Sequence, residues 1–181
     1  DALDGTVNYI HNIPFFCVSI SYWINNKPSL GVIYNPYSGE IFYAEKGLGC
    51  FANQKRLYLK DSRLDDNLTA MAFSGKAYNP SMRLKEFEIF GELNDISQGC
   101  LRTGSAAMNL GYLSAGKFSF VIGKANKIWD VAAGLLIAQE SGALINYEIT
   151  DKKLNLVDYV AGTPSSHKKV LKDIDLSYIK I

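Results

Sequence analysis

Large apolar residues alternate with small or polar ones at residues 16–22, early in the first 60 residues of the chain. Even-numbered positions 16–22 are all large and apolar, whereas Cys or Ser occupies most odd-numbered positions between them. This period is typical of a strand. Asn25 and Asn26, and later residues 37–39, supply turn residues. We therefore expect an antiparallel meander, with strands at residues 15–22, 30–34, 40–44, 50–52 and 55–59.

From about residue 68 the pattern changes to strands alternating with helices. Pro80 is expected to open a helix that carries Leu84, Phe87 and Phe90 on one face. Asp130 is expected to cap a helix that ends before Gly142, and Ser165 to cap the last helix. Strands are expected at residues 69–73, 96–101, 118–122, 143–147 and 159–161, and helices from residue 80 and at residues 105–113, 130–141 and 165–171. This alternation predicts a second, mostly parallel sheet with flanking helices.

The expected fold is therefore a layered α+β or α/β sandwich. Residues 1–60 would form the antiparallel region and residues 61–181 the mixed α/β region. A chain of 181 residues is long enough for one domain, or for two small sheets that share a core. We see no repeat, low-complexity tract or flexible linker, so the two halves are expected to share an interface.

Composition excludes some functions but identifies none. The formal net charge of +1 gives no electrostatic reason to expect nucleic-acid or membrane binding. The three cysteines are odd in number and lack the spacing of metal ligands, so we interpret them as reduced, buried thiols of a cytoplasmic protein. We find no signal peptide and no apolar run of membrane-spanning length.

Two short segments carry the candidate chemistry. Residues 1–6 read Asp-Ala-Leu-Asp-Gly-Thr, and residues 129–134 read Trp-Asp-Val-Ala-Ala-Gly. Their three aspartates have no adjacent Lys or Arg, and carboxylate oxygens are the hard ligands that Mg²⁺ prefers. Taken alone, the first segment could be an ordinary turn and the second an ordinary helix start. Together, in this order, they favour a metal site.

The pair of segments resembles the signature of the inositol monophosphatase family of Mg²⁺-dependent, lithium-sensitive phosphomonoesterases, and particularly its bacterial SuhB-like branch. The resemblance covers nearly the whole chain. It extends to residues 8–15, 31–36, 44–51 and 102–107. It implies hydrolysis of a small polyol or sugar phosphate such as inositol 1-phosphate. It leaves open a homodimer and a SuhB-like role as a partner of transcription proteins with dispensable catalysis, without direct nucleic-acid binding.

The resemblance also implies roles for the residues of the two segments. Asp1 would bridge two Mg²⁺ ions, Asp4 and Asp130 would hold the second ion, and the carbonyl of Leu3 would contact the first. Thr6 would position the attacking water. The alternatives are core packing for Leu3 and an ordinary turn for residues 5–6.

Backbone groups in two places are expected to contact substrate. Gly5 and Thr6 would offer consecutive N–H groups to the phosphate. Gly104, Ser105 and Ala106 would open a helix beside the polyol. Close helix packing through small residues is the alternative at this second place. Trp129 is expected to pack beneath Asp130.

Two departures from the family pattern bear on the substrate. Ala2 stands where a proline is usual. Gly123 stands where inositol-hydrolysing members carry a glutamate that contacts substrate hydroxyls. Sugar bisphosphates and 3′-phosphoadenosine-type nucleotides are therefore alternative substrates. Lys124 and Lys127 could meet a second phosphate or belong to a solvated loop, and Asp158 is expected to be a surface charge or a cap.

The chain opens at Asp1, directly on the first segment. Family members carry a further N-terminal segment that supplies a glutamate ligand and a second acidic residue. We therefore expect an N-terminally truncated fragment. Its parent would be the active phosphatase, whereas the fragment alone would be inactive and poorly soluble, or a degenerate product without a function of its own.

Overall fold

The computed structural model describes residues 1–73 and 80–181 of the chain. A short helix, α1 (Thr6–Ile10), precedes an antiparallel sheet of sequential order, as the alternating pattern predicts. Asn25 and Asn26 adopt positive φ angles of 51° and 59° in its first turn. The strands are β1 (Val18–Ile24), β2 (Lys27–Tyr34), β3 (Ile41–Glu45), β4 (Gly49–Ala52) and β5 (Lys55–Leu57).

The second sheet follows a short 3₁₀ helix, η1 (Leu64–Asp66), and has the order β7-β6-β8-β10-β9. Strands β6, β7 and β8 are parallel, and β10 pairs antiparallel with both β8 and β9. Four of the five strands therefore point the same way, which confirms the predicted mostly parallel sheet. These strands are β6 (Leu68–Phe73), β7 (Cys100–Leu101), β8 (Phe118–Lys127), β9 (Leu144–Asp151) and β10 (Leu156–Gly162).

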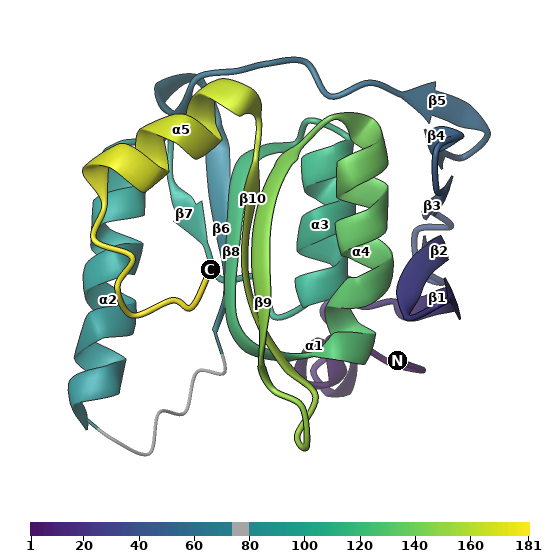
Figure 1. The fold of residues 1–181 in the computed structure, drawn as a ribbon, viewed down its shortest axis with the longest axis horizontal. Coiled ribbons are helices and arrows are strands. Elements are labelled where there is room, and N and C mark those ends of the chain that lie inside the picture. Colours follow the sequence, from purple (N-terminus) through teal and green to yellow (C-terminus); the bar gives the residue numbers. More distant parts are fainter. Residues whose placement is uncertain (74–79) are drawn as a thin grey trace.

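Helices and sheets alternate in four layers (Figure 1). Helices α3 (Ala106–Ser114) and α4 (Ile128–Ser141) lie between the two sheets, while α2 (Pro80–Asp95) and α5 (Pro164–Asp173) cover the far face of the second sheet. One apolar cluster fills each interface between layers. The shared α3–α4 layer holds the two sheets together. The boundary expected near residue 60 falls between β5 and β6 and stays a prediction.

Two glycines allow close contact across the shared layer. A Cβ on Gly31 of β2 would lie 2.8 Å from the carbonyl oxygen of Ala133 in α4. A Cβ on Gly134 would lie 2.6 Å from the Cβ of Leu110 in α3. Real Cβ atoms do not approach other atoms so closely, so glycine at these positions sets how tightly α4 packs against β2 and α3.

Three helix predictions need correction. Helix α4 begins at Ile128, so Asp130 lies in its first turn rather than at the N-cap. Thr163, not Ser165, caps α5, and its hydroxyl accepts a hydrogen bond from the Ser166 N–H. In α2 the buried apolar residues are Ile89 and Leu93, whereas Leu84 and Phe87 are exposed.

Strand β7 is also shorter than the strand predicted at residues 96–101. All three cysteines are buried and unpaired, as expected. No helix in the described part of the chain is both long and apolar enough to cross a membrane.

Candidate metal and substrate site

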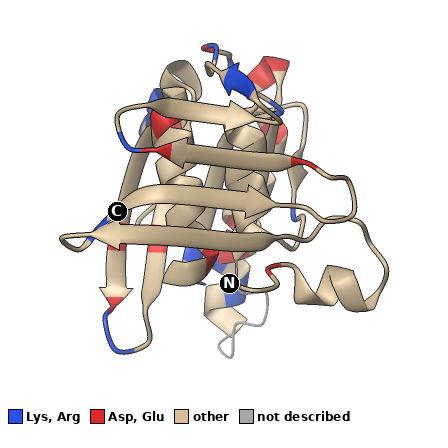
Figure 2. Cartoon of the chain, turned by 90° about the vertical axis from the view of Figure 1, so that its right-hand side faces the viewer, with Lys and Arg blue, Asp and Glu red and all other residues tan. Residues whose placement is uncertain are grey.

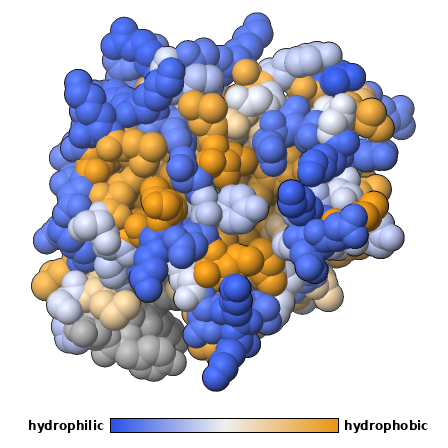
Figure 3. Space-filling view, in the orientation of Figure 1, coloured by the Kyte–Doolittle hydropathy of each residue, from blue (hydrophilic) through white to orange (hydrophobic). Residues whose placement is uncertain are grey.

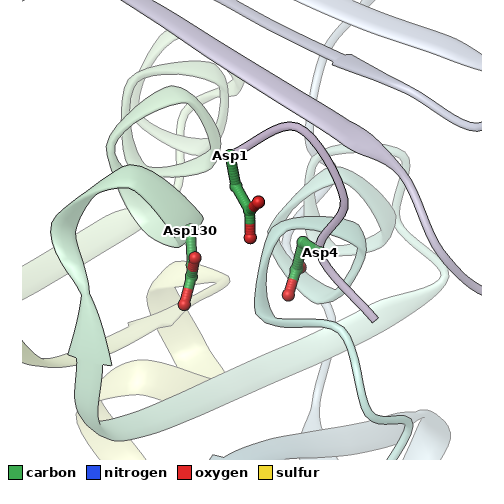
Figure 4. A group of neighbouring side chains, drawn as sticks. All are labelled: Asp1, Asp4 and Asp130. Carbon is green, nitrogen blue, oxygen red and sulfur yellow. The ribbon is translucent and has the colours of Figure 1, made fainter. Parts of the chain in front are cut away.

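Three carboxylates from distant parts of the sequence converge beside the shared helix layer. One carboxylate oxygen from each of Asp1, Asp4 and Asp130 lies within 4.8 Å of the others. Figure 4 shows the three side chains pointing toward a common space. Asp1 and Asp4 belong to the segment before α1, and Asp130 belongs to the first turn of α4. The structure thus brings together the three aspartates that the sequence singled out.

Asp4 is held in place by several hydrogen bonds. Its backbone forms an antiparallel bridge with Cys17, with both N–H···O distances 2.9 Å. Its Oδ2 accepts a hydrogen bond of 2.6 Å from the Ser105 hydroxyl and one of 2.8 Å from the Ala107 N–H. The free N–H groups at the start of α3 therefore orient this carboxylate.

Burial raises the pKa of Asp4 above its ordinary value, and the hydrogen bonds from Ser105 and Ala107 oppose this shift. Burial and the nearby charge of Asp4 raise the pKa of Asp130 to about 6, while a hydrogen bond with the Lys127 main chain opposes the rise. Two carboxylates brought together out of water repel one another. A divalent cation would offset this repulsion, and an all-carboxylate donor set is the chemistry that Mg²⁺ prefers. The residues therefore fit the ion.

The turn of the first segment depends on glycine. Gly5 has a φ of 87°, and a Cβ there would lie 2.9 Å from the carbonyl oxygen of Phe15. Within the same turn the Leu3 N–H donates to Asp1 Oδ1 at 2.9 Å, and the Thr6 hydroxyl donates to the Leu3 carbonyl at 3.0 Å. Leu3 and Thr6 therefore lie next to the carboxylates, and their roles toward metal and water stay predictions.

A cleft of about 390 Å³ opens beside the carboxylates. It is lined by Asp4, Val7, Asn8, Met71, Ala72, Phe73, Arg102, Thr103, Gly104, Ser105, Ala106, Asn126 and Asp130. All three predicted helix-start residues (104–106) lie on its wall. The Ser105 hydroxyl is engaged with Asp4 and also caps α3 through the Met108 N–H at 3.2 Å. Substrate contact at these three residues stays a prediction.

Sequence analysis did not identify Asn8 as a site residue. Its side-chain amide donates to the carbonyls of Phe15 at 2.7 Å and Thr103 at 2.8 Å, which ties the first segment to the start of α3. Gly104 leaves room for it, because a Cβ there would lie 2.8 Å from the Asn8 amide nitrogen. The sequence carries no signal of this contact between residues 95 positions apart.

Of the other predictions around the site, the surface position of Asp158 is wrong. Trp129 is 46% exposed, and its packing beneath Asp130 stays a prediction. Its carbonyl accepts a hydrogen bond from Ser19. Asp158 is buried, and it pairs with Lys124 at 3.1 Å. Lys124 is therefore committed to an ion pair, and Lys127 donates to the Leu154 carbonyl.

The layered fold and its carboxylate cluster define an α/β protein with a candidate site for a hard divalent cation. The chain belongs to the inositol monophosphatase family, whose model matches residues 1–176. This membership and the names of relatives support a phosphatase class for the family to which it belongs.

Similar proteins agree with this assignment. The chain is 31% identical over 95% of its length to "Fructose-1,6-bisphosphatase/inositol-1-monophosphatase" of Aquifex aeolicus, and 33% identical over 96% to "Nus factor SuhB" of Pasteurella multocida. The structure of inositol monophosphatase from Anabaena superposes with a TM-score of 0.81 at 31% identity, covering 93% of this chain and 69% of that one. The chain spans 64% and 65% of the length of the two relatives.

Proposed function

We propose that the protein hydrolyses the phosphate monoester of a small polyol or sugar, with inositol 1-phosphate as the type of substrate, and that it requires Mg²⁺. The convergence of Asp1, Asp4 and Asp130 beside the cleft is the observation that carries the proposal. Family membership and the names of the relatives support it. We also expect inhibition by lithium and a cytoplasmic location.

Different residues of the chain would bind the metal ions, orient the water and bind the substrate. Asp1, Asp4 and Asp130 would hold the metal ions together with the Leu3 carbonyl, and Ser105 and Ala107 keep one Asp4 oxygen occupied. Bound Mg²⁺ would supply charge neutralisation for the phosphoryl oxygens and acidify a water molecule. The Thr6 hydroxyl would orient that water. Backbone groups of residues 5–6 and 104–106 would bind the substrate.

The test is the release of phosphate by the full-length protein with and without Mg²⁺. Asp130→Asn keeps the size of the side chain but removes a charge from the cluster. Altering residues that merely orient metal ligands costs about 10–100-fold, so we expect a loss of more than about 100-fold here. Asp66→Asn is the matched control, because Asp66 is exposed in η1 and lies outside the cleft. Normal turnover by Asp130→Asn would refute the metal assignment.

A second candidate function rests on the names of several relatives. The Pasteurella multocida protein is called a Nus factor, so this protein would bind components of the transcription machinery. The net charge of +1 favours contacts with proteins over direct contacts with RNA. Recovery of RNA polymerase subunits or Nus factors with both the wild type and Asp130→Asn would support this function as independent of catalysis. Their absence from both would remove it.

A further inference from the structure

Strand β8 has an unusual construction at Gly123, beside the cleft residue Ala72. A Cβ on this residue would overlap the ring of Tyr159 and the Oδ1 of Asn126. The register between β10 and β8 shifts between Val157 and Tyr159, and Ala125 adopts a φ of 53°. Tyr159 is the cross-strand partner of Gly123, and its ring occupies the space that a side chain at position 123 would need. Position 123 therefore offers no side chain to the cleft.

Asn126 is the neighbouring residue that does line the cleft, together with Asp4, Asp130 and the start of α3. Its Oδ1 is buried and has no hydrogen-bond partner within residues 1–73 and 80–181. Tyr159 is fully buried, and its hydroxyl also has no hydrogen-bond partner among the described residues. Buried polar atoms are nearly always paired, so an unpaired one on the wall of a binding cleft calls for a partner from a ligand.

An amide suits this position on electrostatic grounds. The carboxylates of Asp4 and Asp130 already lie close together on the wall of the cleft. A further carboxylate beside them would increase the repulsion, whereas a carboxamide is neutral and can both donate and accept. It can therefore bind an alcohol group without changing the charge of the site.

Resting on the proposed function, we propose that Asn126 is a specificity-determining residue that hydrogen-bonds to a free hydroxyl on the alcohol part of the phosphate ester. The Tyr159 ring closes the space above Gly123, so Asn126 is the residue of this part of β8 that reaches the cleft. The preferred substrates are then monoesters of polyols or sugars with a hydroxyl near the ester oxygen. Esters of simple alcohols lack the group that Asn126 recognises.

The experiment compares two substrates on the full-length protein with Mg²⁺. Inositol 1-phosphate carries free hydroxyls, whereas p-nitrophenyl phosphate carries none on its leaving group. We expect Asn126→Ala to lower kcat/KM for inositol 1-phosphate by about 3- to 10-fold, mainly through KM, as for one neutral hydrogen bond. Activity toward p-nitrophenyl phosphate should stay within about twofold of the wild type.

Asn146→Ala is the matched control, because Asn146 is exposed on the edge strand β9 and is not among the residues that line the cleft. Asn126→Ser retains a hydrogen-bonding group and should keep an intermediate preference for inositol 1-phosphate. Thermal unfolding of each variant shows whether the fold is retained.

Two results would overturn the inference in different ways. If the wild type hydrolyses both substrates but Asn126→Ala and Asn126→Ser change neither rate, or change both equally, Asn126 does not determine specificity and the proposed function stands. If the wild type hydrolyses neither substrate with Mg²⁺, the proposed function fails and the inference fails with it.

Discussion

The two sheets differ in how many of their faces are covered. In β8 of the second sheet, Phe120, Val121 and Ile122 are all fully buried, because α3 and α4 cover one face and α2 and α5 cover the other. In β1 of the first sheet, Ile20 and Tyr22 are 57% and 63% exposed. The first sheet buries only the face that meets α3 and α4. Its outer face, seen in Figure 2, carries few charged residues along the strands.

This difference explains the continuous apolar run of β8 but not the alternation in β1, where Ser19 is buried and the apolar Ile20 and Tyr22 face outward. A strand buried on both faces is continuously apolar, whereas a strand buried on one face alternates. The outer face of the first sheet is nevertheless apolar, and Tyr43 and Phe51 stack on neighbouring strands with ring centroids 5.3 Å apart. On the face of the molecule seen in Figure 3, apolar patches are interrupted by hydrophilic side chains. Whether helices cover a face of a sheet therefore cannot be judged from the hydrophobicity of its residues alone.

The way in which the first sheet packs on the helix layer also determines whether the candidate site forms. Asp1 and Asp4 come from the segment that leads into the first sheet, and Asp130 comes from the helix layer that both sheets share. The carboxylates meet only when the first sheet is docked on α3 and α4. Loss of that docking would separate the ligands even if the second sheet stayed folded.

The largest expected effect is the difference in stability loss when the same truncation, isoleucine to alanine, is made in each sheet. Ile122→Ala removes a fully buried side chain and should lower the free energy of unfolding by about 2–5 kcal/mol. Ile20→Ala removes a largely exposed one and should change it by less than about 0.5 kcal/mol. Urea unfolding of both variants measures the difference. Equal costs would contradict the one-sided burial of the first sheet, and would mean that its outer face is covered in the protein tested.

A smaller effect should follow from crowding the contact between the first sheet and α4. Gly31→Ala places a Cβ 2.8 Å from the Ala133 carbonyl oxygen, so the strand and the helix must move apart. We expect a loss of about 1–3 kcal/mol in the free energy of unfolding. We also expect weaker Mg²⁺ binding, measured by calorimetry, because the carboxylates span this contact.

Gly91→Ala in α2 is the control for this substitution, since nothing among the described residues lies within 4 Å of a Cβ there. In a helix, alanine should raise the free energy of unfolding by up to about 1 kcal/mol. If both substitutions stabilise the protein, the close approach of β2 to α4 is not a constraint on the fold.

Much of the fold follows from local patterns. Alternation, Asn-Asn turns and Gly142 at the end of α4 placed most strands and helices near their observed positions. Local patterns did not show which face of α2 is buried against the second sheet. Leu84 and Phe87 are three residues apart and Ile89 and Leu93 four, and both spacings put side chains on one face of a helix. Only the packing against the second sheet selects Ile89 and Leu93.

The candidate site, like the fold, could be predicted only in part from the sequence. The pairing of two aspartate segments indicated which carboxylates would meet, although their roles rest on the resemblance to a family. The contacts that shape the cleft join residues far apart in sequence, as in Asn8 with Thr103, Lys124 with Asp158 and the Tyr159 ring above Gly123. Neither residue of such a pair carries a local signal. These contacts therefore required the structure.

Because helices cover both faces of the second sheet, a histidine is buried on one of them. His11, in the segment before the first sheet, is exposed. His167 of α5 is 5% exposed and lies against Phe120 of β8, with ring centroids 6.5 Å apart. Its Nε2 is buried without a hydrogen-bond partner in residues 1–73 and 80–181. Burial lowers the pKa of His167 below its ordinary value.

In the unfolded chain this imidazole takes up a proton as the pH falls through about 6.5, whereas in the native state it stays neutral until its lowered pKa is reached. Between these two values the unfolded state binds more protons, so the free energy of unfolding falls as the pH falls. One group can contribute at most about 1.4 kcal/mol per pH unit. His167→Gln removes this contribution, so its unfolding free energy, measured by urea denaturation between about pH 5 and 8, should fall less steeply than that of the wild type on the acid side. Parallel curves for the two proteins would show that the imidazole is not held neutral beneath α5.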